Sequence, residues 1–191
     1  FFDGTYNNMI KGTKSAVYPS TSDIAISGLP EGAEVVLAAA KLGDEKYETF
    51  AAAYAAATGD GTETITLCQN LNVNGTSQTL VIAKSLTIDL GDFEVGSVGD
   101  ADTNDYIFDI KNCEVTITNG TIIRRAANEG KRATGTLVRV SGTAPVAATE
   151  EKPASPAVWA KLTIGDGVII KNLGNEDVYI EKGNYTQKII L

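Results

Sequence analysis

The residues that could carry chemistry in this sequence are carboxylates, basic side chains and two cysteines, because its 191 residues include no histidine. Without imidazole there is no Ser-His-Asp or Cys-His catalysis and no histidine ligand for zinc. Imidazole acid–base chemistry near neutral pH is absent for the same reason. These three kinds of site are therefore excluded for this chain.

One polar run has the start of a calcium-binding loop. Asp100, Asp102 and Asn104 would place oxygen ligands at positions 1, 3 and 5 of such a loop. The pattern then fails, because position 6 is Asp105 instead of glycine and position 12 is Lys111 instead of glutamate. A polar loop between strands explains the run as well. Calcium is thus kept as an alternative, and no other cofactor is expected.

The composition is typical of a folded, acidic protein, with 43% hydrophobic and 21% charged residues. A formal net charge of −8 disfavours nucleic-acid binding, which needs a basic face to neutralise phosphates. No apolar run reaches the roughly 18 residues that a membrane span requires. A chain of this length can bury a core as one large domain, alone or with a small extension.

A strand-turn-strand unit recurs along the chain, and its most similar copies are Leu86–Ile88, Val115–Ile117 and Leu162–Ile164. A short strand precedes each copy, and a further copy of that strand comes near the end; these strands are Leu80–Ile82, Phe108–Ile110, Val138–Val140 and Val178–Ile180. A Gly, Asp or Asn corner and another apolar strand follow each copy. Residues 143–158 lengthen the third unit, lack alternation and are interpreted as a projecting loop.

Strands this short cannot bury a two-sided core alone, but stacked as successive coils they bury alternate side chains against their neighbours. Over residues 45–191 the pattern resembles the pectin-lyase-like family. The resemblance implies an all-β fold, a right-handed parallel β-helix, with Ile88, Ile117 and Ile164 as one interior ladder. A β-sandwich is the alternative, but it would need tight hairpins where Asn119-Gly120 instead matches a coil corner.

We divide the chain into two parts. Residues 1–42 are interpreted as an N-terminal arm and a small β extension, with strands at 23–27 and 34–39, which could anchor the protein. Residues 43–191 would hold a helix at about 45–57, N-capped by Asp44, and then the β-helix. The helix would cover the open end of the first coil; a ligand platform is the alternative for its aromatic stripe.

Stacking the copies of the first strand predicts one outward column, formed by Thr66, Val81, Asp109, Arg139 and Tyr179. Pectin-lyase-like enzymes carry catalytic residues on the outward side of one sheet, so the resemblance implies Asp109 and Arg139 as catalytic candidates. The same two residues with Tyr179 are candidates for carbohydrate binding. One carboxylate supplies neither a glycosidase acid pair nor a calcium cluster, and a surface ion pair is the alternative.

The copies of the second strand predict another outward column, formed by Asn72, Thr87, Thr116 and Thr163. Cross-strand threonine pairs favour a sheet, which is a sufficient reason for their presence. The cysteines, Cys68 and Cys113, lack CxxC spacing and would lie about 10 Å or more apart, too far for a disulfide. We expect two free, partly buried thiols.

Three classes of function remain. The small number of coils, the acidic Thr/Ala/Gly-rich surface and the lack of paired acids favour a non-catalytic structural or adhesive protein. It would be extracellular, on a virion as a head fibre or capsid decoration, or on a bacterial cell surface. The alternatives are a carbohydrate-binding module and a polysaccharide lyase or hydrolase. Expected partners are further copies (a trimer for a fibre), a capsid or cell-surface protein held by the N-terminal arm, and surface glycans.

Overall fold

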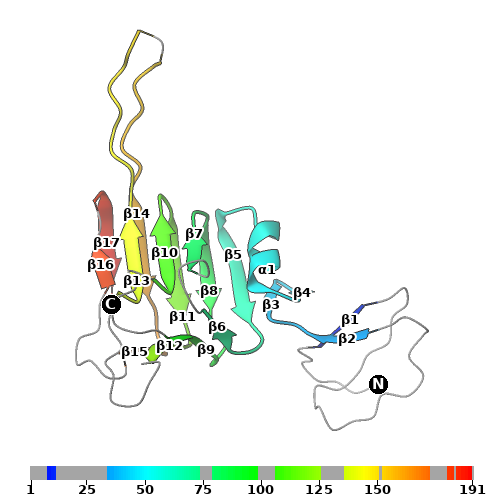
Figure 1. Cartoon of the computed structure of the whole chain (residues 1–191). Helices are drawn as coiled ribbons and strands as arrows, with labels where there is room; N and C mark the ends of the chain where they lie inside the picture. The colour runs from blue at the N-terminus through cyan, green and yellow to red at the C-terminus, as the bar shows by residue number, and fades with distance from the viewer. Residues whose placement is uncertain are drawn as a thin grey trace.

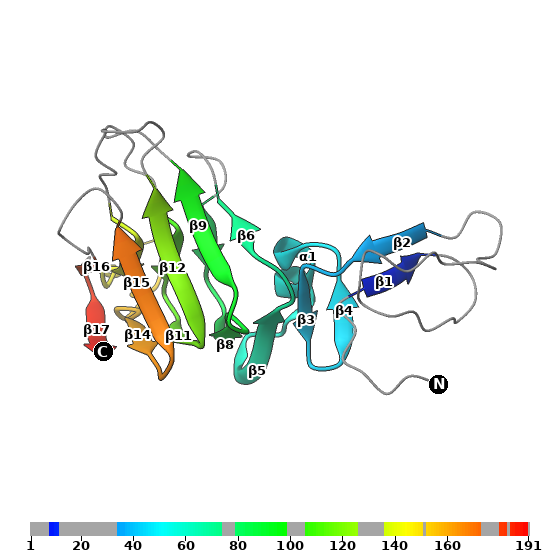
Figure 2. The ribbon, with the colours of Figure 1, turned by 90° about the horizontal axis from the view of Figure 1, so that it is seen from below.

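The computed structural model of the chain describes residues 8–11, 34–73, 79–98, 106–125, 136–150, 152–172, 180–182 and 184–190. Most of their strands lie in three sheets (Figures 1 and 2). The first sheet contains β7 (Leu80–Ile82), β10 (Phe108–Lys111), β13 (Val138–Ser141) and β16 (Ile180–Lys182). The second contains β5 (Asp60–Leu67), β8 (Ser85–Asp89), β11 (Glu114–Thr118), β14 (Ala160–Ile164) and β17 (Thr186–Ile190). The third contains β6 (Leu71–Asn72), β9 (Glu94–Val98), β12 (Gly120–Arg125) and β15 (Val168–Asn172).

The chain passes through these sheets in a repeating order. Three consecutive passes, β7-β8-β9, β10-β11-β12 and β13-β14-β15, each place one strand in the first, second and third sheet. One such pass is a coil. Neighbouring coils pair in parallel in every sheet. The prediction of an all-β chain with parallel sheets is confirmed at this level.

The core is built from alternate side chains that point between the sheets. Ile65, Ile88 and Ile117 occupy matching positions of β5, β8 and β11 and are fully buried. Ile164 continues the row on β14 and is half-buried. The intervening residues face outward because successive side chains of a strand point to opposite faces. The predicted interior ladder of isoleucines is confirmed.

The corners between strands are made by residues that tolerate left-handed backbone. Asn119 (φ 49°) and Gly120 (φ 128°) separate β11 from β12, which lie in different sheets. A side-chain carbon at Gly120 would lie 2.5 Å from the Phe93 carbonyl oxygen and 2.6 Å from the Leu90 Cβ. Only glycine fits this corner. The Asn-Gly pair therefore turns a coil, as predicted, and does not close a hairpin.

The helix is shorter than predicted and begins later. Helix α1 spans Phe50–Ala56, with Thr49 as its N-cap accepting a 3.0 Å bond from the Ala52 amide. The predicted start near residue 45, with Asp44 as N-cap, is wrong because Glu45–Tyr47 form strand β4. Strand β4 pairs antiparallel with β3 (Ala40–Leu42), and that pairing overrides the local helix preference of these residues.

Helix α1 covers the end of the stack at β5 (Figure 1). Phe50 and Ala53 are buried, whereas Ala51 is exposed. The helix is fastened to the next coil, because the Ala83 amide donates to the Tyr54 hydroxyl at 2.7 Å and the Lys84 ammonium donates to the Tyr54 carbonyl at 2.9 Å. These contacts give the helix the position of a cap.

The N-terminal extension is only partly described. Strand β2 (Glu34–Leu37) pairs antiparallel with β1 (Asn8–Lys11). The strand predicted at 23–27 lies outside the described residues. The predicted boundary between residues 42 and 43 falls within the β3–β4 hairpin, and β3 pairs antiparallel with β5. Residues 40–42 thus belong to the second sheet, because they pair with the edge of β5 that is not bonded to β8.

The projecting loop is an antiparallel ribbon that rises from the end of β13 and returns to β14 (Figure 1). Residues 143–158 are named the ribbon arm here. All its described residues are exposed except the half-buried Ala157. The prediction of a projecting segment at these residues is confirmed.

Candidate functional site

The outward column of the first sheet brings the two predicted catalytic candidates together. Asp109 stands opposite Arg139 on the neighbouring strand, and Val81 stands on the other side of Asp109. The prediction that Asp109 and Arg139 are adjacent is confirmed. Val81 is 47% exposed, so this face of the sheet is open to solvent at β7.

Two members of the predicted column are placed differently. Thr66 stands opposite Asp89 in the second sheet, because β5 pairs with β8 and not with β7. Tyr179 lies outside the described residues. The residue opposite Arg139 is Glu181, since β16 pairs two residues later than the sequence alignment predicted. The tyrosine of the predicted column is therefore replaced, in register, by an acidic residue.

Asp109 is a buried carboxylate that is only half paired. Its side chain is 8% exposed, and one oxygen lies 2.9 Å from the Lys111 ammonium two residues along the same strand. The other oxygen, Oδ1, is buried and has no hydrogen-bond partner. Unsatisfied buried oxygens of this kind are rare because each loses its contact with water without replacement.

Arg139 is paired with an aromatic ring and not with Asp109. Its guanidinium carbon lies 5.3 Å from the centre of the Tyr106 ring, and Nη1 donates to the Tyr106 hydroxyl at 3.4 Å. Its Nε is buried and lacks a hydrogen-bond partner. The alternative reading, a surface ion pair between Asp109 and Arg139, is wrong, since each side chain has another neighbour. Sequence reasoning missed Tyr106 because it precedes β10 and lies outside the strand pattern.

These groups can recognise a polar ligand. A carboxylate oxygen accepts and a guanidinium N–H donates, and both of the atoms concerned lack protein partners. The Tyr106 ring offers an apolar face beside them. This combination suits a sugar, whose hydroxyls both donate and accept and whose ring carbons pack on aromatics. The arrangement does not by itself supply the pair of flanking carboxylates that glycoside hydrolysis uses.

The predicted metal ligands fall in a segment that the structure does not describe. Asp100, Asp102 and Asn104 all lie outside the described residues. Within the described part of the chain, no group of three or more cysteine, aspartate and glutamate side chains is placed to hold a metal ion.

The outward column of the second sheet is a threonine ladder, and the prediction was wrong for one of its four positions. Thr87, Thr116 and Thr163 stand in register on β8, β11 and β14, as predicted. The first position is Thr64 on β5, not Asn72. Asn72 lies on β6 of the third sheet, opposite Gly96, because β5 occupies the position in the second sheet.

A polar hollow of about 310 Å³ opens beside this ladder. It forms where β5 loses register with β8 between Asp60 and Thr64. Glu63 fixes this bulge by accepting the amides of Thr58 and Gly59, at 2.7 and 2.8 Å, and these bonds lower the pKa of its carboxyl. The hollow is lined by Asp60, Gly61, Ser85, Leu86, Thr87, Glu114 and Thr116. It was not predicted, since a bulge leaves no periodic signal.

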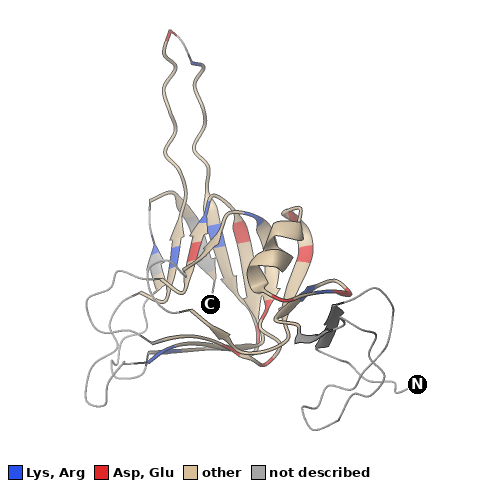
Figure 3. Ribbon diagram, turned by 45° about the vertical axis from the view of Figure 1, so that its right-hand side comes forward, with Lys and Arg blue, Asp and Glu red and all other residues tan. Residues whose placement is uncertain are grey.

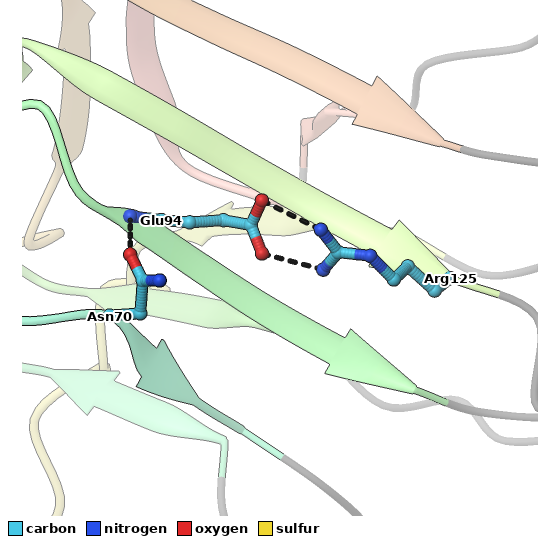
Figure 4. A network of polar contacts seen from close by, with 3 residues as sticks. All are labelled: Asn70, Glu94 and Arg125. Atoms are coloured by element: carbon cyan, nitrogen blue, oxygen red, sulfur yellow. Dashed lines mark hydrogen bonds and ion pairs between the residues drawn. The ribbon is translucent and has the colours of Figure 1, made fainter.

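Polar side chains connect successive coils at several positions. Arg125 on β12 holds both carboxylate oxygens of Glu94 on β9, and the Glu94 amide donates to Asn70 at 2.9 Å (Figure 4). The Arg125 guanidinium lowers the pKa of the Glu94 carboxyl. Further links join Lys161 to Glu114 at 3.0 Å, Asn119 to Asp89 at 3.1 Å, and Thr143 to Asn112 at 2.7 Å.

Neither cysteine forms a disulfide, as predicted, and both thiols are buried more fully than the partial burial expected. The Cys113 thiol lies 3.4 Å from the Ile82 carbonyl oxygen, which accepts its weak hydrogen bond. Burial raises the pKa of Cys113 to about 11 and also raises that of Cys68. A raised pKa leaves little thiolate at neutral pH, so neither group has the character of a nucleophile.

Comparison of the chain with protein-family models, with curated proteins and with solved structures finds no match. In the described residues, no helix is long and apolar enough to cross a membrane.

Proposed function

We propose that the chain is a non-catalytic structural or adhesive protein, exposed on a virion or on a bacterial cell surface. Its fold would be a right-handed parallel β-helix of the pectin-lyase-like kind. The parallel pairing of matching strands, the repeated order of the three sheets and the interior isoleucine row support this fold.

The observation that carries the proposal is that polar side chains on the outside of the stack bind side chains of the neighbouring coil. The carboxylates of Glu94 and Glu114 bind Arg125 and Lys161 of the following coil. Asn119 binds Asp89 of the preceding coil in the same way. Side chains engaged in this manner join coils and are not held ready for a substrate. A stack joined along its length suits a spacer or fibre segment that must keep its shape outside the cell.

Two measurements test this proposal. An antibody raised against the purified chain should label the outside of intact cells or particles of the source organism, seen by immunogold electron microscopy. Incubation with polygalacturonate, alginate and β-glucans, with and without calcium, should release neither unsaturated uronates nor new reducing ends. Label confined to the cell interior, or product that grows with protein concentration, would contradict the proposal.

Glycan binding is a second candidate, and the half-paired groups of the first sheet favour it. Asp109 Oδ1 and Arg139 Nε are buried without partners, and Tyr106 lies under the guanidinium. Both atoms are covered where they stand, so binding of a sugar would require the Asp109 and Arg139 side chains to turn outward, after which its hydroxyls would satisfy both. The register position of Glu181 beside Arg139 adds a second acidic residue to the column, which is the reason to include the turnover assay.

A glycan array followed by calorimetry tests this candidate. Tyr106→Ala and Asp109→Asn should each weaken binding of an array hit at least tenfold, while Val81→Ala on the same face should change it less than twofold. A hit whose affinity is unaffected by both substitutions would place the binding elsewhere and refute this site.

A further inference from the structure

The ribbon arm is an excursion that makes few contacts with its own molecule. It leaves the body between β13 and β14 and projects away from both (Figure 1). Its limbs are held together by backbone bonds to each other, and Thr143 at its base bonds Asn112. An isolated two-stranded hairpin is marginally stable in water, because ordering its backbone costs more than its own contacts return. We therefore expect the arm to bind a surface of another molecule, which would stabilise it.

The hydrogen bonds of the arm do not follow the spacing of a β-ladder. Paired amides and carbonyls join Thr143 to Val158, Val146 to Ser155 and Thr149 to Lys152, which is every third residue. A β-ladder would bond every second residue, whereas three residues make one turn of polyproline II. Three prolines, at positions 145, 153 and 156, fit this conformation and remove donors from the ribbon. The arm is therefore suited to binding through side chains and not through an added strand.

The arm is uncharged except at its tip. Glu150 and Lys152 lie at the tip, and the two limbs carry no charged residue in a chain that is 21% charged (Figure 3). Val146 and Val158 are 46% and 43% exposed. Depletion of charge around exposed apolar side chains is the compositional signal of an interface core.

An aromatic pair lies at the base of the arm, formed by the exposed Trp159 and the half-buried Tyr185. Trp159 is 51% exposed, and its ring meets the edge of Tyr185 with centres 5.5 Å apart. Tyr185 has a positive φ of 55°, which is strained for a bulky residue, and its carbonyl accepts the Ala160 amide at 3.1 Å. A side-chain carbon at Gly142 would lie 2.5 Å from the same carbonyl oxygen. The close packing fixes the aromatic pair in place.

We propose that the arm of one molecule packs its proline and valine side chains on Trp159 of a second copy of this chain, and that the exchange is reciprocal. Polyproline II segments dock on aromatic side chains, and the chain carries both halves of that contact. The arm of a molecule cannot pack on its own Trp159, since this residue directly follows the arm in the sequence and the arm projects away from the body (Figure 1). Two copies related by a twofold axis can satisfy each other.

The size of the contact agrees with a dimer. A limb of about seven residues at roughly 3.1 Å each makes an arm about 22 Å long. With a width of about 10 Å, each arm covers roughly 220 Å² on its own side and as much on the partner, so two arms bury about 900 Å². That is the lower end of the range for specific interfaces, and association in the micromolar range is expected. The inference stands apart from the proposed function, since it concerns the arm alone.

Trp159 is the only tryptophan of the chain, so its fluorescence reports on the contact directly. As the full chain is concentrated, its mass by light scattering should double, and the Trp159 emission should shift to shorter wavelength over the same range. Val146→Glu should raise the midpoint concentration at least tenfold. Val81→Glu is the matched control, because Val81 is equally exposed on β7, and it should change the midpoint less than twofold.

Replacing residues 144–157 by Asn-Gly should give a monomer at every concentration with unshifted Trp159 emission, and an unchanged thermal midpoint would show that the body still folds. Four results would overturn the inference, and the first three concern the mass of the particle. They are a full chain that stays monomeric, a dimer that persists without the arm, and equal effects of Val146→Glu and Val81→Glu. A dimer with solvent-exposed Trp159 emission would equally refute the contact.

Discussion

Arg125 binds both carboxylate oxygens of Glu94, at 2.6 and 2.7 Å, from the neighbouring strand of the third sheet. The two residues are not opposite each other, since Thr121 stands opposite Glu94. The arginine reaches back along the strand and passes close to Gly96, whose missing side chain leaves room for the pair. A bidentate pair of this kind fixes both strands in one register.

Glu94→Gln should lower the free energy of unfolding at pH 7 by about 0.5 to 1 kcal/mol, a modest amount because solvent screens this partly exposed pair. The pKa of Glu94 is lowered in the folded state, so its contribution is present above its ordinary pKa and lost as pH falls through the folded value. The difference between the native protein and the variant should therefore vanish between about pH 5 and pH 3. Urea titrations across this range measure it, with Glu150→Gln on the exposed arm as the control. A pH-independent difference would contradict the role of the pair.

Ile117→Ala should lower the free energy of unfolding by about 2 to 5 kcal/mol, because it leaves a cavity in the middle of the interior row. Ile169→Ala on β15 is the control; that side chain is 49% exposed and should cost well under 1 kcal/mol. Denaturant unfolding followed by circular dichroism gives both values. A loss below about 0.5 kcal/mol at Ile117 would mean that this residue faces solvent.

The repeat in the sequence was sufficient to place the interior of the stack. Leu86, Val115 and Leu162 pair in register because each copy has the same alternation of inward and outward residues. The Asn119-Gly120 corner was recognisable for a related reason, since few residues tolerate its backbone. Where local pattern and packing agree, the sequence specifies position to the residue.

The pairing register of β16 with β13 could not be predicted in the same way, because the sequence alignment was wrong by two residues. A shift of two preserves which side chains face inward, so alternation allows either Tyr179 or Glu181 opposite Arg139. The choice depends on the length of the connection before β16. Asn72 was placed in the threonine ladder for a different reason, since the prediction assigned β5 to the first sheet and β6 to the second, whereas they lie in the second and third sheets. The β3–β4 hairpin was not predicted. Residues 45–47 form strand β4 because they pair with β3, which itself pairs with β5, and such tertiary contacts leave no local signal in the sequence.

The Cys113 thiol should make stability fall at alkaline pH. Burial raises its pKa to about 11 in the folded state, from an ordinary value of 9.0. The folded protein therefore holds this proton more tightly, and the stability it contributes is present below pH 9 and is lost as pH rises towards 11. The difference in unfolding free energy between the native protein and Cys113→Ala should fall by roughly 2 to 3 kcal/mol across this window.

Urea titrations from pH 8 to about pH 11 measure this difference, and subtraction of the variant removes the contributions of tyrosine and lysine titration. The rate of alkylation by iodoacetamide gives an independent reading, since only the thiolate reacts. A difference in stability that stays constant over the whole range would mean that Cys113 ionises as a solvent-exposed thiol.

Gly120→Ala should be more damaging than Gly43→Ala, because two separate costs add at the Gly120 corner. The backbone has φ 128°, a region that side chains strongly disfavour, and the new carbon would meet the Phe93 carbonyl and the Leu90 side chain. Together these effects should cost about 3 kcal/mol or more. Gly43→Ala is the matched control, since Gly43 also has a positive φ, 59°, but has no atom within 4 Å of the added carbon. It should cost about 1 to 2 kcal/mol, from the backbone alone. Thermal and urea unfolding of the two variants provide the comparison, and equal losses would show that the corner can relax around a side chain.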